Sequence, residues 1–341
     1  MMPTINKNER PLNKMSNMVK AVRIHEFGGA DKLSLDDIEL GKPGAGEICV
    51  RHKAVGLNFI DVYMRTGTYP LPLPHVLGME GAGVVEAVGQ GVGEFKIGDR
   101  VAYAAQPPGA YAEARIIAAD RVVKIPDGIT DETAAAMMLQ GLTAQYLLRR
   151  TYNVKKGDTI LMHAAAGGVG LIVCQWAKLL GATVIGTVGT EEKAKIAKAH
   201  GCDQTIIYTR ENFLDRVKEI TNGQGVEVVY DSIGKDTFMQ SLDCLKPLGT
   251  MVTYGNATGP VEPFAPGILA GKGSLFVTRP TLFTYIAKRE DLVAMARELF
   301  DVVLSGKVKI EVGQKYPLAN VAQAHADLEG RKTTGSTVLI P

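Results

Sequence analysis

A glycine-rich turn between an apolar strand and an apolar helix constrains the fold of this chain more than any other feature. Residues 164–170 read AAAGGVG and follow an apolar run that ends at His163. The turn has the form A-x-G-x-x-G, and in a strand–turn–helix context this form is typical of a dinucleotide-binding unit. Gly167 lets the backbone approach a pyrophosphate, and Gly170 lets the helix lie close to the strand. Because the helix N-terminus offers free N–H groups to phosphates, we expect a bound dinucleotide here rather than a tight turn without a ligand.

Short apolar runs alternate with helical segments from residue 159 onward. The expected strands are Thr159–His163, Thr183–Val188, Gln204–Ile207, Val226–Tyr230, Thr250–Tyr254 and Ser274–Thr278. The expected helices between them are Val169–Leu180, Glu191–Ala199, Asn212–Ile220 and Thr237–Leu245. This alternation predicts an α/β fold with a doubly wound parallel sheet of the Rossmann type. We place this domain at residues 141–280.

Residues 18–125 have a different, β-rich pattern. Short apolar runs such as Val84–Val88 are separated by glycines and prolines, which predicts a barrel or sandwich of short strands. Thr130 is the expected cap of a long helical run over Thr133–Arg150. The strand-like tail Ser336–Ile340 is expected to return to the β-rich domain and make it discontinuous. That domain then comprises residues 18–140 and 281–341.

Composition and charge exclude several classes of protein. The 38 basic and 36 acidic residues nearly cancel, and no run of Lys or Arg indicates a nucleic-acid or acidic-membrane surface. No apolar stretch reaches the roughly 18 residues that a membrane span needs. Residues 1–17 are polar and lack the apolar core of a secretory signal. We therefore expect a disordered extension there, with a transit peptide as the alternative, and a cytoplasmic protein.

The four cysteines are expected to be reduced. Cys49, Cys174, Cys202 and Cys244 are far apart and form no C-x-x-C pair. A structural zinc site needs closely spaced sulfur ligands, because all of them must reach one small tetrahedral centre. A disulfide framework is not expected in a chain without an export signal.

The end of the second expected strand distinguishes the two nicotinamide cofactors. In NAD-binding folds an acidic residue at the tip of this strand holds the ribose 2′-OH. Here residues 186–190 read GTVGT, and the missing acid leaves room for a 2′-phosphate. Lys193 follows in the next helix and can meet that phosphate. Glu191 and Glu192 argue mildly against it, unless they serve the helix N-terminus. The missing acid and Lys193 together outweigh the two glutamates, so the sequence predicts NADPH as the cofactor.

Several motifs together make the chain resemble a known family. They are residues 56–61 (GLNFID), 78–83 (GMEGAG), 98–101 (GDRV), 140–143 (QGLT), 163–170 (HAAAGGVG), 230–234 (YDSIG) and 278–280 (TRP). From about Val19 to Pro341 the chain resembles the quinone oxidoreductase (zeta-crystallin-like) family of the medium-chain dehydrogenase/reductase superfamily. The resemblance implies a GroES-like (chaperonin-10-like) fold for the β-rich catalytic domain. It also implies an active site in the cleft between the domains, and a homodimer.

Two positions separate this chain from the zinc-dependent alcohol dehydrogenases of that superfamily. Those enzymes place a zinc-binding Cys where this chain has Asn58, and a zinc-binding His where it has Met79. A thioether is a poor zinc ligand beside thiolate, imidazole and carboxylate. His75 has no evident second ligand, and we expect it to be structural. The chain departs from alcohol dehydrogenases as quinone reductases do, so we expect no metal.

The resemblance also implies roles for individual residues. Asn58, Tyr63 and Tyr69 are the implied catalytic and cleft-lining side chains around the nicotinamide and the substrate. The residues implied around the 2′-phosphate are Gly189, Lys193, Tyr208 and Arg331. The other expected cofactor contacts, from the glycine-rich turn and from the resemblance, are Thr143, Ala166, Gly167, Gly168, Val169, Gly170, Ser232, Gly255, Asn256, Phe276, Val277 and Thr278.

The implied function is hydride transfer from NADPH to a quinone. One alternative is reduction of the C=C bond of an enone or alkenal, which would use the same cofactor in an equally zinc-free cleft. Another is a non-catalytic role, as an NADPH-binding crystallin or an RNA-binding relative, although the near-neutral charge counts against RNA. The expected partners are a small-molecule acceptor and a second copy of the chain, with no nucleic acid and no membrane.

Overall fold

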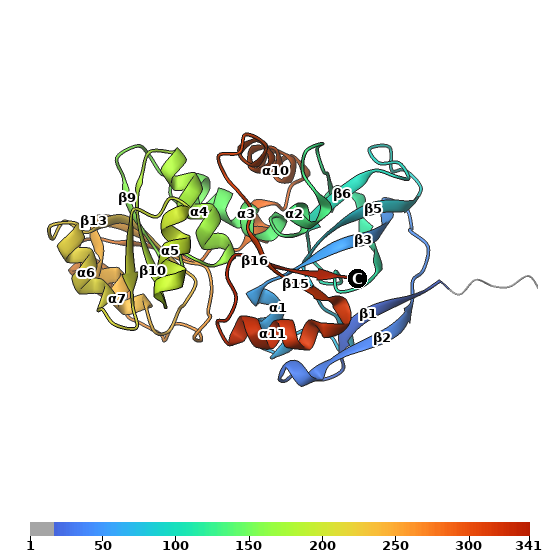
Figure 1. Cartoon of the computed structure of the whole chain (residues 1–341), viewed down its shortest axis with the longest axis horizontal. Helices are drawn as coiled ribbons and strands as arrows, with labels where there is room; N and C mark the ends of the chain where they lie inside the picture. Colours follow the sequence, from blue (N-terminus) through green and yellow to red (C-terminus); the bar gives the residue numbers. More distant parts are fainter. Residues whose placement is uncertain (1–16) are drawn as a thin grey trace, which may run out of the picture.

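Six parallel strands form the sheet that the alternating pattern predicts (Figure 1). The computed structural model describes residues 17–341, so all of the expected N-terminal extension except Asn17 lies outside the described residues. The strands are β9 (Thr159–Met162), β10 (Thr183–Val188), β11 (Gln204–Ile207), β12 (Val226–Asp231), β13 (Leu245–Thr253) and β14 (Phe276–Thr278). Their order is β11-β10-β9-β12-β13-β14, and every neighbouring pair is parallel. The order reverses between β9 and β12, and open α/β sheets bind ligands at such a switch point.

Helices cover both faces of this sheet because its strands are apolar on both sides. The helices are α4 (Gly168–Leu179), α5 (Glu191–Ala199), α6 (Phe213–Ile220) and α7 (Phe238–Asp243). On β9, Ile160 and Met162 share one apolar core with residues of α4 and α5. Leu161 lies in a second core with residues of α6 and α7. Successive side chains of a strand point to opposite faces, so this division is what a strand buried on both sides requires.

The expected single helix over Thr133–Arg150 is wrong. Two helices, α2 (Asp131–Ala135) and α3 (Met138–Tyr146), replace it, and a π-helical turn ends the segment. The cap at Thr130 is confirmed, because its hydroxyl accepts a hydrogen bond from the backbone N–H of Thr133. The break lies at Met137, whose φ of −128° is not helical. No glycine or proline marks the break; Met137 is fully buried in the core, and tertiary packing commonly overrides helix propensity.

A seven-stranded sheet and a three-stranded sheet make up the β-rich part of the molecule. The larger sheet has the order β15-β16-β3-β5-β6-β8, with β7 also paired to β3, and the smaller one has the order β2-β1-β4. Their strands are β1 (Met18–Ile24), β2 (Leu33–Glu39), β3 (Glu47–Leu57), β4 (His75–Val76), β5 (Glu80–Val88), β6 (Arg100–Ala104), β7 (Ala114–Ala118), β8 (Val123–Lys124), β15 (Val312–Pro317) and β16 (Ser336–Ile340). The tail strand β16 pairs antiparallel with β3, so the chain does return to this part.

Helix α3 and the C-terminal segment connect the two parts beside the glycine-rich turn. Helix α3 is buried along nearly its whole length and packs against α4 and against α10 (Arg289–Leu304). The backbone N–H of Gly335 donates to the carbonyl of Ala166 at 3.1 Å. The shorter helices are α1 (Phe59–Arg65), α8 (Gly267–Gly271), α9 (Leu282–Tyr285) and α11 (Val321–Glu329). Within residues 17–341, no helix combines the length and apolarity that crossing a membrane requires.

Candidate active site

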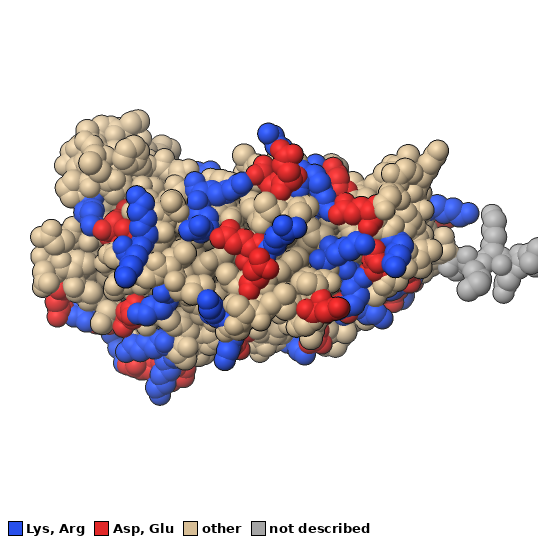
Figure 2. Space-filling model, turned by 90° about the horizontal axis from the view of Figure 1, so that it is seen from above, with Lys and Arg blue, Asp and Glu red and all other residues tan. Residues whose placement is uncertain are grey.

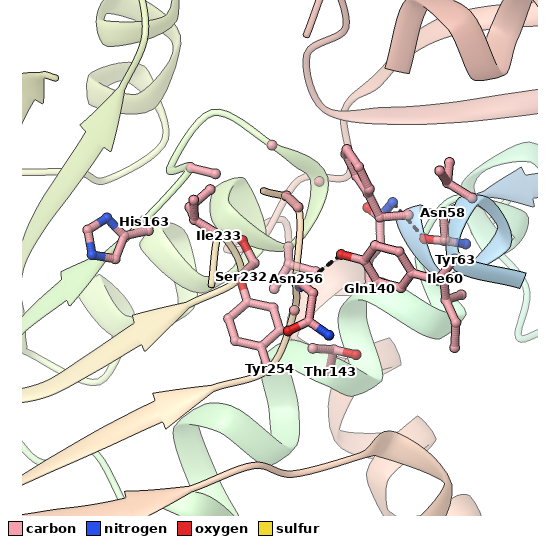
Figure 3. A pocket seen from close by; sticks show the side chains of 18 of the residues that line it. Asn58, Ile60, Tyr63, Gln140, Thr143, His163, Ser232, Ile233, Tyr254 and Asn256 are labelled. Atoms are coloured by element: carbon pink, nitrogen blue, oxygen red, sulfur yellow. Dashed lines mark hydrogen bonds between the residues drawn. The ribbon is translucent and has the colours of Figure 1, made fainter. Parts of the chain in front are cut away.

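One large cavity, of about 1310 Å³, runs between the two parts of the molecule. It is lined by the glycine-rich turn and by the carboxyl ends of β10, β12 and β13 on one side, and by α1 and α3 on the other. Figure 3 shows Asn58, Tyr63 and Gln140 on one side of the view, with Ser232 and Tyr254 on the other. The cavity therefore lies at the switch point of the parallel sheet, where a dinucleotide is expected.

The glycine-rich turn has the shape that a close phosphate contact requires. A Cβ at Gly170 would lie 2.4 Å from the carbonyl oxygen of Ala164, so only glycine lets α4 begin this close to the strand. A Cβ at Gly167 would meet only that same oxygen, at 3.2 Å, which leaves the cavity side of the backbone open. Ala165 stands where the pattern usually has glycine, and its methyl group packs toward Gly186, where a Cβ would lie 2.6 Å from it. The turn thus accommodates alanine at its first position because the neighbouring strand carries glycine.

Two cations meet at the end of the cavity nearest to β10. The Lys193 ammonium donates to the carbonyl of Arg331 at 2.7 Å, and the Arg331 guanidinium donates to the Tyr208 hydroxyl at 3.4 Å. Burial, and then the charge of Arg331, lower the pKa of Lys193. Within residues 17–341 neither cation forms a salt bridge. An anion between them would relieve their repulsion, so this cluster fits a 2′-phosphate.

The acids that argue against NADPH in the sequence face elsewhere. Glu191 forms a salt bridge with Arg210 at 2.8 Å, and both side chains are exposed. Neither Glu191 nor Glu192 lines the cavity. The hydroxyl of Thr190 caps α5 by accepting from the backbone N–H of Lys193, and hydrogen bonds to its own backbone N–H and to the Thr190 side chain lower the pKa of Glu192 at the same helix end. Neither acid therefore adds a carboxylate to the cavity wall beside Lys193.

Asn58 occupies the opposite end of the cavity, at the N-terminus of α1. Its backbone N–H donates to the Asp61 carboxyl group at 2.9 Å, which fixes the first turn of the helix. Its side-chain amide lies 2.7 Å from Glu80 Oε2 and 3.1 Å from Gln140 Nε2. Figure 3 shows the contact between Asn58 and Gln140. Because the amide is held on both sides, its plane is fixed before any ligand enters.

Two tyrosines of the β-rich part reach across the cavity to the loop after β13. The Tyr63 hydroxyl oxygen accepts a hydrogen bond from the backbone N–H of Asn256 at 2.9 Å (Figure 3). Burial raises the pKa of Tyr63 to about 12, so the phenol stays protonated. The Tyr69 hydroxyl oxygen accepts from Arg279 at 3.2 Å and from the Asn256 side chain at 3.4 Å. The two rings lie edge to face, with centroids 5.3 Å apart.

The cavity brings together most of the expected site residues. The predicted residues that line it are Asn58, Tyr63, Tyr69, Thr143, Ala166, Gly167, Gly168, Val169, Gly170, Gly189, Lys193, Tyr208, Ser232, Gly255, Asn256 and Arg331. Phe276, Val277 and Thr278 do not line it; they form β14 at the edge of the sheet, where Phe276 is 61% exposed. Contact of these three residues with a cofactor stays a prediction.

Sequence patterns missed several polar residues of the site, four of which lie near Asn58 or at the cavity wall. Gln140, His163 and Arg279 line the cavity, and Glu80 lies directly behind Asn58. Gln140 and Glu80 stand within motifs of the family resemblance, but no residue spacing shows that both contact Asn58. His163 is buried, and its ring is hydrogen-bonded to Thr187 at 3.0 Å and to Ser241 at 2.9 Å. It therefore serves the packing at the end of β9.

The residues at the two zinc positions are arranged for other contacts. Met79 is fully buried in the core of the β-rich part, and Asn58 is engaged by Glu80 and Gln140. Among residues 17–341, no group of three His, Cys, Asp or Glu side chains is placed to hold a metal ion. The four cysteines are free and buried. The absence of zinc from the purified protein stays a prediction.

Known proteins match this chain over both its β-rich part and its Rossmann sheet. The alcohol dehydrogenase GroES-like domain model matches residues 44–127, and the zinc-binding dehydrogenase model matches residues 168–301. A quinone oxidoreductase of Pseudomonas aeruginosa is 54% identical over 95% of this chain and 100% of its own length. A 2-haloacrylate reductase of a Burkholderia species is 47% identical over 95% of this chain and 99% of its own. The crystal structure of Escherichia coli quinone oxidoreductase complexed with NADPH matches with a TM-score of 0.93 and 50% identity, covering 94% of this chain and 100% of that one.

Proposed function

The chain belongs to the quinone oxidoreductase family of the medium-chain dehydrogenase/reductase superfamily, and we propose that it transfers a hydride from NADPH to a quinone. One observation carries the proposal. A single cavity contains the paired cations Lys193 and Arg331 at one end and Asn58 with Tyr63 at the other. A dinucleotide phosphate needs an anion site and a sheltered redox end joined by a phosphate-binding turn, and this cavity offers all three.

The protein's own groups account for the binding of NADPH. The N-terminus of α4 and the open backbone at Gly167 face the pyrophosphate. Lys193 and Arg331 hold the 2′-phosphate, with Tyr208 beside them. Thr143, Ser232 and the loop at Gly255 and Asn256 form the walls around the rest of the cofactor. When bound, NADPH supplies the hydride at its nicotinamide ring.

The acceptor end supplies orientation and hydrogen bonds. Asn58 is held rigid on both sides, and the Tyr63 oxygen is fixed by Asn256. Among residues 17–341 no acceptor receives the phenolic hydrogen of Tyr63, so it is available to the oxyanion that develops on a quinone oxygen. Tyr69 forms the adjoining wall. A hydride and a proton convert a quinone to an aromatic hydroquinone, so the reaction needs proximity more than strong Lewis-acid activation.

The alternative functions have less support. Relatives at 50–54% identity are named quinone oxidoreductases, and their sequences align along their full lengths with this chain. The relative named for 2-haloacrylate reduction makes an activated C=C bond the second acceptor to test. Figure 2 shows basic and acidic side chains interspersed on one face of the molecule, which gives no continuous basic surface there for RNA.

The family also suggests the assembly and location of the protein. Strand β14 lies at the edge of the six-stranded sheet and exposes Phe276, so its open edge can pair with β14 of a second copy. We place the homodimer there and the enzyme in the cytoplasm. Light scattering during gel filtration tests the dimer, and a monomer at micromolar concentration would contradict it.

A panel of acceptors tests the function. The purified protein is mixed with NADPH and, in turn, a benzoquinone, a naphthoquinone, an enone, an alkenal and a 2-haloacrylate. The proposal predicts the largest kcat/KM for quinones. A larger kcat/KM for an alkenal or haloacrylate would replace quinone reduction by C=C reduction, and NADPH binding without any turnover would support a non-catalytic role.

A further inference from the structure

A buried row of four polar side chains runs behind the cavity from the last strand to the first residue of β5. Its members are Ser336 of β16, Gln140 of α3, Asn58 at the N-terminus of α1, and Glu80 of β5. Ser336 Oγ lies 2.6 Å from Gln140 Oε1, Gln140 Nε2 lies 3.1 Å from Asn58 Oδ1, and Asn58 Nδ2 lies 2.7 Å from Glu80 Oε2. None of the four is more than 8% exposed. We call these four residues the polar row; Figure 3 shows its central link.

The two ends of the polar row decide in which direction its hydrogen bonds run. At one end the backbone N–H of Leu139 donates to Glu80 Oε1 at 2.8 Å, so Oε1 is the natural carbonyl oxygen and a proton on this carboxyl group is best placed on Oε2, facing Asn58. At the other end Ser336 Oγ lies 2.9 Å from the carbonyl oxygen of Ala136 as well as beside Gln140. A carbonyl oxygen only accepts, and a hydroxyl has a single hydrogen to donate.

The contact with Ala136 therefore favours one direction. If Ser336 donates to Ala136, Gln140 must turn its amide nitrogen to Ser336 and its oxygen to Asn58. Asn58 must then turn its nitrogen to Gln140 and its oxygen to Glu80. Amide oxygen and nitrogen exchange by a half-turn of the terminal group, so the heavy atoms keep their places. Every contact of the row is then satisfied, provided that Glu80 Oε2 carries a hydrogen. The opposite direction leaves two buried acceptors facing each other at 2.9 Å.

The surroundings of Glu80 also favour a protonated carboxyl group. The side chain is fully buried, and among residues 17–341 no cation forms a salt bridge with it. Burial raises the pKa of Glu80 to about 8, although the hydrogen bonds with Asn58 and Leu139 act to lower it. Of the titratable groups around it, Asp61 of α1 has a pKa raised to about 7 by burial. Tyr103 of β6 and Tyr111 have pKa values raised by burial, so both stay neutral.

We propose that Glu80 is a carboxylic acid in the working enzyme, and that its proton sets the direction of the polar row and so the orientation of the Asn58 amide. Glu80 and Gln140 are then positioning residues for the reaction at Asn58. The inference rests on the proposed function only where it assigns a consequence for turnover; the direction of the polar row is a property of the protein alone.

The direction matters because Gln140 lies against the glycine-rich turn. A Cβ at Gly168 would lie 1.9 Å from Gln140 Oε1, so this amide packs directly on the residue that begins α4. With Glu80 protonated, the Asn58 nitrogen is the atom beside Gln140, and it keeps a second hydrogen that Gln140 does not take. Loss of the Glu80 proton puts the Asn58 oxygen there instead, and removes that donor.

Nuclear magnetic resonance measures the direction without any turnover. The full-length protein is made with asparagine labelled at its side-chain carbonyl carbon, and the signal missing in Asn58→Asp identifies Asn58. We expect this signal to shift with a midpoint near pH 8 in the wild type and in Asp61→Asn, and to stay constant in Glu80→Gln. A midpoint below about pH 6 in the wild type, or an equal shift in Glu80→Gln, would overturn the proposal.

Kinetics then measure the consequence. Glu80→Gln keeps a donor toward Asn58 and an acceptor toward Leu139, whereas Glu80→Leu has neither. We expect Glu80→Leu to lower kcat with NADPH and a quinone by about 10-fold or more, and Glu80→Gln to restore most of that loss. The wild-type kcat should fall above about pH 8, and the fall should be absent in Glu80→Gln. Glu86→Gln, an exposed change on the same strand, is the matched control.

The two measurements separate the two ideas. A pH-dependent Asn58 signal in a protein that oxidises no NADPH would refute the proposed function and leave the polar row as described. Normal quinone turnover with equal kcat in Glu80→Leu and the wild type would refute the positioning role and leave the proposed function standing.

Discussion

The phenol oxygen of Tyr63 accepts a 2.9 Å hydrogen bond from the backbone N–H of Asn256, across the cleft between the β-rich part and the Rossmann sheet. This contact uses the oxygen and leaves the hydroxyl hydrogen for a ligand. The hydroxyl is therefore held in place by one part of the molecule while its ring belongs to the other. Its position depends on both parts being correctly placed.

Tyr63→Phe tests whether this hydroxyl takes part in the reaction. We expect kcat to fall by about 10- to 1000-fold, because removal of a fully engaged oxyanion donor costs about 100- to 1000-fold and a weaker contact costs less. Asn58→Ala should give a loss in the same range. Steady-state kinetics with NADPH and a benzoquinone measure both variants. A change confined to KM would mean that the two side chains only shape the cleft, and Tyr69→Phe provides the comparison with a neighbouring wall residue.

Lys193→Ala tests the choice of cofactor. A charge-assisted hydrogen bond contributes about 1.5–3 kcal/mol, so we expect NADPH affinity to fall roughly 10- to 150-fold. The affinity for NADH should change little, because NADH has no 2′-phosphate. Fluorescence titration with both cofactors makes the measurement, and Lys195→Ala on the same helix is the control. Equal losses for NADPH and NADH would assign Lys193 to something other than the 2′-phosphate.

The purified protein is expected to contain no zinc. Asn58 and Met79 stand at the two positions where alcohol dehydrogenases have ligands, and the cysteines are scattered and buried. Elemental analysis and activity after treatment with a chelator are the measurements. Stoichiometric zinc together with loss of activity on chelation would show that other residues bind the metal.

The buried carboxyl groups give stability a defined dependence on pH. Burial raises the pKa of Asp61 to about 7 and of Glu80 to about 8. In the unfolded chain both titrate near pH 4, so the folded protein holds these two protons up to a higher pH than the unfolded chain does. Their contribution is fully present below about pH 4 and is lost as the pH rises toward the folded values. Urea unfolding should give a free energy that falls between about pH 5 and 8, by an amount on the order of a few kcal/mol.

Glu80→Gln should flatten this dependence, because glutamine does not titrate. Its stability relative to the wild type should therefore increase as the pH rises. The exposed substitution Glu86→Gln should follow the wild-type curve. If Glu80→Gln and the wild type show the same slope, Glu80 is already ionised in the folded protein.

The sequence predicts those features that depend on neighbouring residues. The turn at 164–170 and the alternating apolar runs lead to β9, α4 and the parallel sheet, since strand and helix periodicity are local. The absence of an acid at the tip of β10 is likewise visible in the short stretch 186–190 alone. The break between α2 and α3 does not, because Met137 is buried in a core that includes residues distant in the sequence.

The polar residues of the site show the same limit. Gln140 and Glu80 are 60 positions apart in the sequence, and both contact Asn58 only because α3 packs against the first residue of β5. Lys193 is 138 positions from Arg331, and the turn before β16 brings them together. Long-range packing of this kind leaves no periodic pattern, so Tyr208 and Arg331 were expected only from the family resemblance.

A single-turnover experiment tests the central claim most directly. The protein is saturated with NADPH and mixed rapidly with a small benzoquinone, while the loss of the reduced nicotinamide and the formation of hydroquinone are followed together. Hydride transfer in the cleft predicts one hydroquinone for each NADPH consumed, at a rate that falls in Tyr63→Phe and Asn58→Ala. A folded, NADPH-saturated protein that oxidises no NADPH with any small benzoquinone or naphthoquinone would contradict the claim.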